Sequence, residues 1–563
     1  MFFNGSALHS SQVRSYDASP KTPAENQAVD FRPHRLSVRT LPFQGEKGSS
    51  TLPGAAMDQY LDISRARDLP NAKDRALYRF FEILPGFLSL STLFLIGVFS
   101  WLKPSWVAYF IILFDLYWTL KVAYLSINQV ICFRSMQKYI RVDWQVKLRQ
   151  IPDWENVYHL IILPMAREGW DVVRETLGTL KSSAYPKDKF IVVLAQEERA
   201  GEHRLEIAKL AEQEFGATFY KFLITVHPKD LIGEVIGKGS NTAYAATKAK
   251  ELVDGLGIAY KNILVSTFDI DTKAFPQYFF CLTYNYLISP NNQRASYQPI
   301  PVYHNNIWQA SPLTRVVAVS NTFWQMMQQE RPEQLVTYSS HSMPAEPFFE
   351  VGYPKTVVSD DSRIFWKAFL KYDGNYRVVP LRYPVSMDIV MAENIEKTFL
   401  NLYKQQKRWA WGCVEIPFFM FNFVKNKKIS LQKKIFYSLA ALESFWSWAC
   451  ASLLILLLGW LPLLLGGDKF NITVLSYNLP RLTSTIMIFA MSGMIVGALT
   501  NIMFLPPAPK RVGRWKKFSM LWQWLLLPPA LIVFGSLPAL DAQIRLIFGR
   551  YMEFWNTPKI RKD

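Results

Sequence analysis

The stretch 262-NILVSTFDID-271 joins a run of apolar residues to two carboxylates that stand two positions apart. The run over residues 262–267 is short and apolar, which predicts a buried strand. Asp269 and Asp271 follow this strand, and carboxylates at that spacing can hold one hard divalent cation, Mg²⁺ or Mn²⁺, with positions left open for phosphate oxygens. A solvated turn that caps the next element also fits these residues. The residues on either side of this stretch are therefore needed to decide between a cation-binding site and a solvated turn.

Residues 157–394 alternate short apolar runs with amphipathic helical patterns. The runs lie at 157–163, 190–195, 219–226 and 262–267, and the helical patterns lie at 169–183, 202–215 and 240–253. This β-α-β-α order predicts an α/β domain with a mainly parallel sheet and helices on both faces. Ligands of such sheets bind beyond the carboxyl ends of the strands. We therefore expect residues 269–271 to lie in a site.

A second pair of carboxylates, Asp360 and Asp361, occurs in Ser359-Asp-Asp. A carboxylate that is not bound to metal can take the proton from an acceptor hydroxyl as that hydroxyl attacks. Alternatively, Ser359 or Asp360 caps a helix over residues 363–370. The motif by itself favours neither role.

A third motif, Gln405-x-x-Arg408-Trp409, lies on a helix predicted for residues 395–413, where its spacing places all three side chains on one face. Arg408 can bind a diphosphate leaving group, and Trp409 can stack on a sugar ring. The same pattern is typical of an interfacial helix, with Trp409 at headgroup level and basic side chains on anionic lipid. Both roles are compatible, because the helix precedes an apolar block.

Apolar blocks enclose the α/β domain on both sides, and they are long enough to cross a bilayer. We expect a disordered tail over 1–75, two transmembrane helices in 76–133, a basic linker over 134–156, an interfacial region over 395–434, a block of about three membrane segments over 435–540 and a basic tail over 541–563. The net charge of +18 arises largely from basic residues beside the apolar blocks. This placement favours a multi-pass protein of the cell membrane with a cytoplasmic catalytic domain, and it disfavours nucleic-acid binding.

The order of these motifs resembles the membrane-bound family 2 glycosyltransferases, the inverting group that includes cellulose, hyaluronan and chitin synthases. Its members share an Asp-x-Asp, then a Thr/Ser-Glu/Asp-Asp, then a Gln-x-x-Arg-Trp ahead of a transmembrane block. The resemblance implies a GT-A-type nucleotide-sugar-binding domain inserted between transmembrane helices. It also implies that Asp269 and Asp271 bind the metal and the donor diphosphate, that Asp361 is the general base, and that residues 405–409 line the acceptor and the leaving diphosphate.

The resemblance extends to the residues expected to bind the donor nucleotide. Pro164 and Glu168 match the family's Pro-x-x-Asn-Glu, with Arg167 in place of Asn, and Lys238 matches a Gly-Lys that helps to hold the donor. Glu197 stands where the family places an Asp that contacts uracil and ribose. These departures leave the identity of the nucleotide open, whereas the change from Thr-Glu-Asp to Ser-Asp-Asp keeps the final carboxylate.

The expected function is the transfer of a sugar from a nucleotide sugar, a UDP-sugar by resemblance, to a polysaccharide or lipid acceptor at the bilayer. The expected reaction is metal-dependent and inverts the anomeric carbon. One alternative is a membrane phosphoglycosyl or nucleotidyl transferase that uses the same carboxylates. Another is a catalytically inactive membrane scaffold or transporter, against which the carboxylates Asp269, Asp271 and Asp361 argue.

Overall fold

The computed structural model describes residues 60–510 and 513–555. Most of the expected disordered tail, residues 1–59, and the last part of the expected basic tail, residues 556–563, lie outside this described part. Residues 60–75 do not show the disorder that the sequence predicts for them. Leu61, Ile63 and Leu69 are buried. Their side chains pack into hydrophobic clusters formed by residues far away in the sequence, and local composition does not reveal such contacts.

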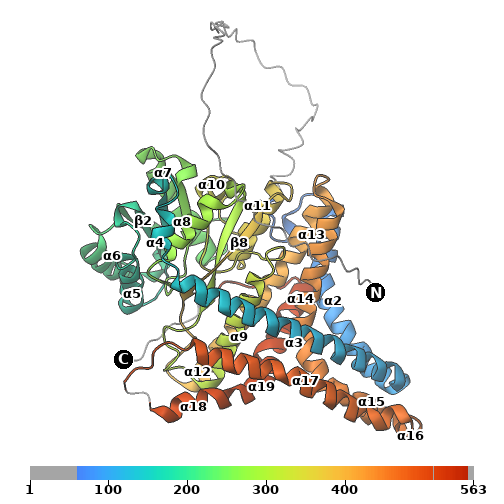
Figure 1. Ribbon diagram of the computed structural model, residues 1–563. Coiled ribbons are helices and arrows are strands. Elements are labelled where there is room, and N and C mark those ends of the chain that lie inside the picture. The colour runs from blue at the N-terminus through green and yellow to red at the C-terminus, as the bar shows by residue number, and fades with distance from the viewer. Residues whose placement is uncertain (1–59, 511–512, 556–563) are drawn as a thin grey trace, which may run out of the picture. The chain divides into compact units, whose positions relative to one another are not determined.

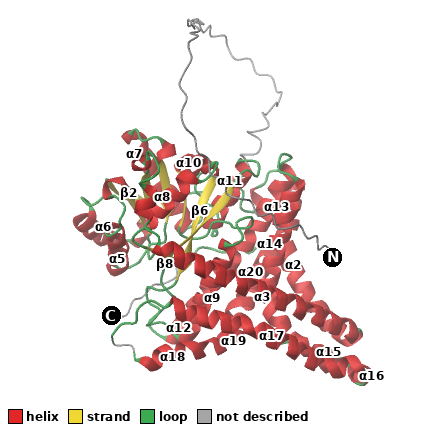
Figure 2. Cartoon of the chain, viewed as in Figure 1, coloured by secondary structure: helices red, strands yellow, loops and turns green. Residues whose placement is uncertain are grey.

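One mixed sheet of eight strands forms the centre of the catalytic part (Figure 2). Its order is β3-β2-β1-β4-β7-β6-β8-β5. The strands are β1 (Tyr158–Pro164), β2 (Phe190–Glu197), β3 (Lys221–His227), β4 (Ile263–Thr267), β5 (Lys273–Ala274), β6 (Ala295–Val302), β7 (His341–Pro344) and β8 (Arg377–Ser386). Strands β1 to β4 pair in parallel, β7 is antiparallel to both neighbours, β6 and β8 are parallel, and β5 is antiparallel to β8. The expected mainly parallel α/β sheet is confirmed, with two reversed strands added.

Helices cover both faces of the sheet because alternate strand residues point to opposite sides. In β1, Ile161 and Leu163 join one core cluster, whereas Leu160 and Ile162 join another. The first cluster packs against α4 (Trp144–Leu148), α5 (Trp170–Lys181), α6 (Glu202–Phe215) and α8 (Tyr278–Ile288); the second packs against α7 (Lys238–Leu256), α10 (Ala345–Val351), α11 (Asp360–Lys371) and α13 (Glu415–Lys425). Both cores are therefore continuous with the sheet.

The reversed strand β7 brings a second set of loop residues to the edge where β4 ends. Thr267, the last residue of β4, pairs with His341, the first residue of β7. Since the strands run in opposite directions, the segment before β7 meets the segment after β4. Ser339 therefore reaches Asp269, although seventy positions separate them.

In the part of the chain that the structure describes, five helical segments are long and apolar enough to cross a membrane. They are α2 (Ala72–Leu102), α3 (Pro104–Arg141), α14 (Leu431–Leu456), α17 (Val474–Phe504) and the segment Ser519–Ile547. Helices α3 and α17 lie side by side (Figure 1), and they pack so closely that a Cβ added at Gly493 would collide with Val122. The remaining helices of the apolar blocks and their connections are α9 (Pro312–Gln329), α12 (Ile395–Ala410), α15 (Leu461–Leu465), α16 (Gly467–Asn471), α18 (Arg514–Trp522), α19 (Leu527–Leu531) and α20 (Leu537–Ile547).

The last apolar segment is helical throughout, but α-helical stretches alternate in it with a 3-10 turn over Gln523–Leu526 and a π-helical turn. Pro528, Pro529 and Pro538 lie within it, and a prolyl residue removes a backbone donor from a helix. A π-helical turn over Ile532–Ser536 joins α19 to α20. Helix α20 then packs against α2 and α12.

A buried ion pair fastens α11 to α13. Arg363 Nε lies 2.6 Å from Glu415 Oε2, and both residues are almost fully buried. The Ser359 hydroxyl donates to the other oxygen of Glu415, and Arg363 Nη1 donates to the carbonyl of Ile63 at 3.1 Å. The helix that carries Asp361 is thereby tied to the helix that follows the Gln-x-x-Arg-Trp motif.

Replacement of Glu415 by Gln should lower the free energy of unfolding by about 3 kcal/mol, because it leaves the buried Arg363 charge without a counter-charge. The urea midpoint of the detergent-solubilised protein, followed by tryptophan fluorescence, measures the change. Glu251→Gln is the control, since Glu251 pairs with Lys248 at the exposed surface of α7. Equal midpoints for the two variants would contradict a structural role of the buried pair.

Candidate active site

The two carboxylates after β4 are held differently. Asp271 is 1% exposed, and its Oδ2 accepts a hydrogen bond from the backbone N–H of Asp388 at 3.0 Å. Asp269 is more accessible, with its side chain 24% exposed, and its Oδ2 accepts from the Ser339 hydroxyl at 2.6 Å. The short turn that follows β4 thus orients one carboxylate inward and leaves the other facing the open side of the sheet edge.

Lys238 joins the first carboxylate motif to the second. It is the first residue of α7, and its Nζ lies 2.8 Å from Asp269 Oδ1 and 2.8 Å from Asp361 Oδ1. Burial by itself would lower the pKa of Lys238, but the charges of Asp269 and Asp361 outweigh burial and hold that pKa above its ordinary value. One ammonium therefore bridges two carboxylates that are far apart in sequence.

Asp361 lies in the first turn of α11, beside groups from several elements. Its Oδ1 is 3.2 Å from the Tyr353 hydroxyl and 4.0 Å from His341 Nδ1. Burial lowers the pKa of His341 to about 4, so this imidazole is neutral at pH 7. The Thr337 hydroxyl donates to the Asp361 carbonyl at 2.6 Å. Asp361 is thus anchored within the site, and Asp360 occupies the first position of the helix, so the motif also begins a helix.

The helix α12 contributes two of its three expected residues to the lining of a small pocket. Gln405 and Trp409 line it together with Tyr303 and Asp388. The rings of Trp409 and Tyr303 lie 6.5 Å apart. Because the backbone N–H of Asp388 donates to Asp271, this pocket adjoins the carboxylates that are expected to bind the metal.

Arg408 points elsewhere on α12. Its guanidinium carbon lies 5.1 Å from the centre of the Phe554 ring. The Arg408 charge still acts on the neighbouring acidic groups, since it is among the influences that lower the pKa of Asp360. The three residues of the motif therefore do not all line one pocket.

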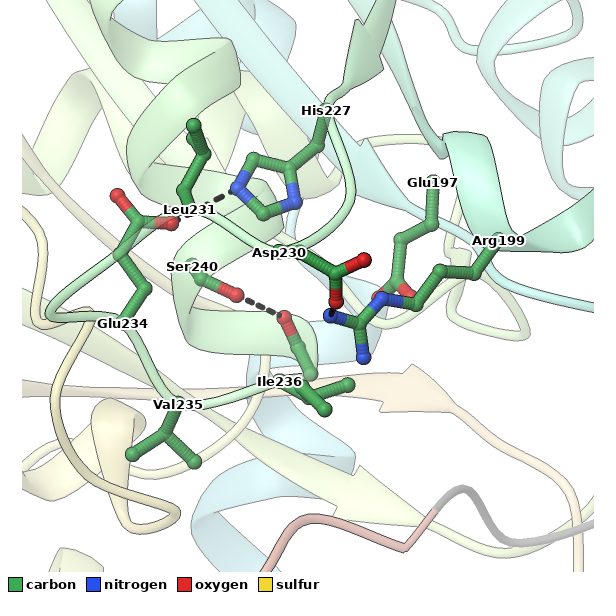
Figure 3. A pocket seen from close by; sticks show the side chains of 10 residues that line it. Glu197, Arg199, His227, Asp230, Leu231, Glu234, Val235, Ile236 and Ser240 are labelled. Atoms are coloured by element: carbon green, nitrogen blue, oxygen red, sulfur yellow. Dashed lines mark hydrogen bonds and ion pairs between the residues drawn. The ribbon is translucent and has the colours of Figure 1, made fainter.

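A second small pocket lies beyond the ends of β2 and β3 (Figure 3). Glu197 ends β2 beside His227 at the end of β3. Arg199 pairs with Asp230 at 2.9 Å, and His227 Nε2 pairs with Glu234 at 2.8 Å. Burial raises the pKa of Glu197, against the opposing influence of His227 and Arg199. The expected Glu197 thus lines a charged pocket.

The other two nucleotide-binding residues expected from the sequence lie at the end of β1. Pro164 is buried and pairs with Ala195 of β2. Glu168 follows in the loop, where its Oε2 accepts from the backbone N–H of Ala166 at 2.7 Å. Neither residue is among those that line the two pockets. Both residues lie at the carboxyl end of the parallel strands, but they take no part in the ion pairs of Lys238 with Asp269 and Asp361.

Residues beyond the last apolar segment also reach this region. A Cβ added at Gly237 would collide with the Phe554 ring, so this ring packs directly on the backbone before Lys238. Lys404 of α12 lies 5.2 Å from the ring of Trp555. The sequence carries no signal for this contact, because aromatic residues that follow an apolar block resemble interfacial anchors. The sequence likewise gives no signal that Tyr353 lies beside Asp361, because a single tyrosine in a loop forms no recognisable motif.

The donor chemistry at Asp269 and Asp271 suits a hard divalent cation, because carboxylate oxygens are the ligands that such ions prefer. Within residues 60–510 and 513–555, no cluster of three or more His, Cys, Asp or Glu side chains is suited to a metal ion. A cation held here would therefore take most of its ligands from a bound diphosphate and water, as is usual for Mg²⁺ at phosphate sites.

Comparisons with known proteins identify the catalytic part. Residues 266–535 match the sequence profile of glycosyl transferase family group 2. No curated protein sequence matches the chain. Among solved structures, the mannosyltransferase PcManGT from Pyrobaculum calidifontis, in complex with GDP-Man and Mn²⁺, has 14% identity and a TM-score of 0.38, over 77% of this chain and 98% of its own. Residues 1–349 of S. aureus TarS, in complex with UDP-GlcNAc, have 11% identity and a TM-score of 0.33, over 62% and 91%.

The profile match begins within β4, just before Asp269, and ends inside the last apolar segment. It therefore includes both carboxylate motifs and α12. Residues 266–535 thus carry a match to glycosyl transferase family group 2, and the protein is a glycosyltransferase.

Proposed function

We propose that the protein transfers a sugar from a nucleotide-sugar donor, a UDP-sugar, to a hydroxyl of a glycan or membrane-lipid acceptor, with inversion at the anomeric carbon. The observation that carries this proposal is the bridge of Lys238 between Asp269 and Asp361. It places the carboxylate expected to bind the donor next to the carboxylate expected to act as base. The pocket at Trp409 adjoins the same region through Asp388 and Asp271.

In the proposed reaction, the acceptor hydroxyl gives its proton to Asp361 while its oxygen attacks the anomeric carbon. The bond to the nucleoside diphosphate breaks, and its electron pair leaves with the diphosphate. Lys238 and Arg408 supply positive charge near the leaving group, and Trp409 offers an apolar face on which an acceptor ring can stack. A divalent cation held by Asp269 and Asp271 would add charge neutralisation of the diphosphate. Positioning and charge account for most of the acceleration in this scheme.

We place the protein in the cell membrane with its catalytic part on the cytoplasmic side. The support is the distribution of basic residues. Arg134, Lys138 and Arg141 lie at the end of α3, and Lys425, Lys427, Lys428, Lys433 and Lys434 lie before or at the start of α14. Positive residues that flank membrane helices concentrate on the cytoplasmic side.

The test is a panel of nucleotide sugars supplied to membranes that carry the protein, scored for released nucleoside diphosphate with Mn²⁺, with Mg²⁺ or with a chelator. We expect one donor class to be turned over and the chelator to suppress that turnover. Donors labelled separately in the sugar and in the β-phosphate distinguish the alternatives. Sugar label without phosphate label in the product supports the proposal, whereas phosphate label in the product would indicate a phosphoglycosyl transferase.

A further inference from the structure

One hydroxyl group lies between the two adjacent carboxylates of the Ser-Asp-Asp motif. Tyr353 Oη is 3.0 Å from Asp360 Oδ2 and 3.2 Å from Asp361 Oδ1. Asp360 is 2% exposed and Tyr353 is 5% exposed, so water has little access to this contact. In a buried site a hydrogen bond to a carboxylate is stronger than the same bond in water.

The backbone fixes where this hydroxyl points. Tyr353 follows Gly352, whose φ of +71° ends α10 in a conformation that favours glycine. The Tyr353 ring packs against Phe348, with the ring centres 5.9 Å apart. The next carbonyl, that of Pro354, is pressed against α7, because a Cβ added at Gly239 would lie 2.6 Å from it. Tyr353 is therefore held from α10 and from α7 together.

The protons can be assigned along this contact. Burial raises the pKa of Tyr353 well above its ordinary value, so the hydroxyl keeps its proton. Burial, together with the nearby charge of Asp361, raises the pKa of Asp360 to about 7. Lys238 on α7 and Arg408 on α12 oppose that rise, and the other titratable groups facing Asp361 are Asp269 and the neutral His341. The Tyr353 hydroxyl is therefore the donor in both contacts, to Asp360 Oδ2 at 3.0 Å and to Asp361 Oδ1 at 3.2 Å.

We propose that Tyr353 is a positioning residue for the base, whose hydroxyl donates to Asp361 and fixes the rotation of that carboxylate toward the acceptor. This inference rests on the proposed function, because it needs Asp361 to be the base. Among the described residues, the charged group closest to this carboxylate is the Lys238 ammonium, whose Nζ lies 2.8 Å from Asp361 Oδ1 and 2.9 Å from Oδ2. Tyr353 makes the orientation independent of where Lys238 lies when a donor is bound.

The test compares Tyr353→Phe with Tyr376→Phe in the full-length protein. Tyr376 belongs to the same buried cluster, and its hydroxyl bonds Ser296 Oγ at 2.7 Å, away from the carboxylates. We expect Tyr353→Phe to lower kcat about tenfold, the effect of losing one hydrogen bond to a charged group, with the KM for donor within about twofold of wild type. Tyr376→Phe should leave kcat within about twofold. Equal kcat values in the two variants, or a change in KM alone, would overturn the proposal.

A second pair of variants separates positioning from folding. With 4-aminophenylalanine at position 353 the N–H donor is retained, and with 4-methylphenylalanine the shape is retained without a donor. We expect the amino variant to keep at least about half of the wild-type kcat and the methyl variant to lose about tenfold. The proposal fails if both behave alike. Asp361→Asn serves as the reference: if it remains active, the proposed base is wrong, and if it is inactive while Tyr353→Phe is not, only the role of Tyr353 is wrong.

Discussion

Replacement of Asp361 by Asn should lower kcat for sugar transfer about a thousandfold while leaving the affinity for the donor within about twofold. The amide has nearly the shape of the carboxylate but cannot take the acceptor proton, and proton transfer by a positioned group contributes about 10² to 10⁴-fold. Asp361 reaches the site from the first turn of α11, and its Oδ1 and Asp269 Oδ1 each lie 2.8 Å from Lys238 Nζ. The loss should therefore appear in turnover rather than in binding.

The measurement is the rate of nucleoside diphosphate release at saturating donor and acceptor, with the donor Kd determined by calorimetry on the same preparation. Asp254→Asn is a matched control, since Asp254 lies on the same helix as Lys238 but pairs with Lys250 at the surface. A turnover rate close to that of wild type would remove Asp361 from the reaction.

The second large effect should come from Asp269→Asn, which we expect to lower kcat/KM about a thousandfold and to weaken donor binding as well. The substitution removes a negative charge that pairs with Lys238 and that would help to hold a cation on the diphosphate. Electrostatic contacts with charge that develops in the transition state contribute about 10² to 10³-fold each. Release of nucleoside diphosphate is titrated against Mn²⁺ and against Mg²⁺, beside the donor Kd.

The two variants should differ in a defined way. Asp361→Asn should keep the wild-type dependence on divalent cation, whereas Asp269→Asn should shift it to higher concentration. If Asp269→Asn keeps both the cation dependence and the donor Kd of wild type, the assignment of the Asp-x-Asp motif to the donor is wrong. The same result would leave the role of Asp361 intact.

The parallel half of the sheet could be predicted because each strand is a short apolar run followed by an amphipathic helix. The helix at residues 202–215 has the predicted bounds, and β4 begins within one residue of its expected start. The reversed strand β7 could not be predicted in this way. Its four residues, His341–Pro344, show no apolar alternation and end in proline, and only pairing with β4 makes them a strand. In β6 the register shifts between Gln298 and Ile300, next to prolines that also hide the period.

In the candidate site, too, residues in local motifs could be predicted, whereas the contacts between them could not. Asp269, Asp361 and Lys238 stand in short local motifs, so the sequence alone marks them. Their common contact depends on α7, β4 and α11 meeting at one sheet edge, which no local pattern records. Tyr353 and Phe554 carry no motif and act through packing that folding creates. The face of α12 was predicted only in part, because a helix that contacts two surfaces can send Arg408 and Trp409 in different directions.

The packing of Phe554 on Gly237 sets an order for the biogenesis of the protein. Phe554 is translated after all five apolar segments, whereas Gly237 lies between the second and the third. A nascent chain can therefore build its sheet early, but the neighbourhood of Lys238 stays incomplete until the residues that follow the last apolar segment have reached the sheet edge.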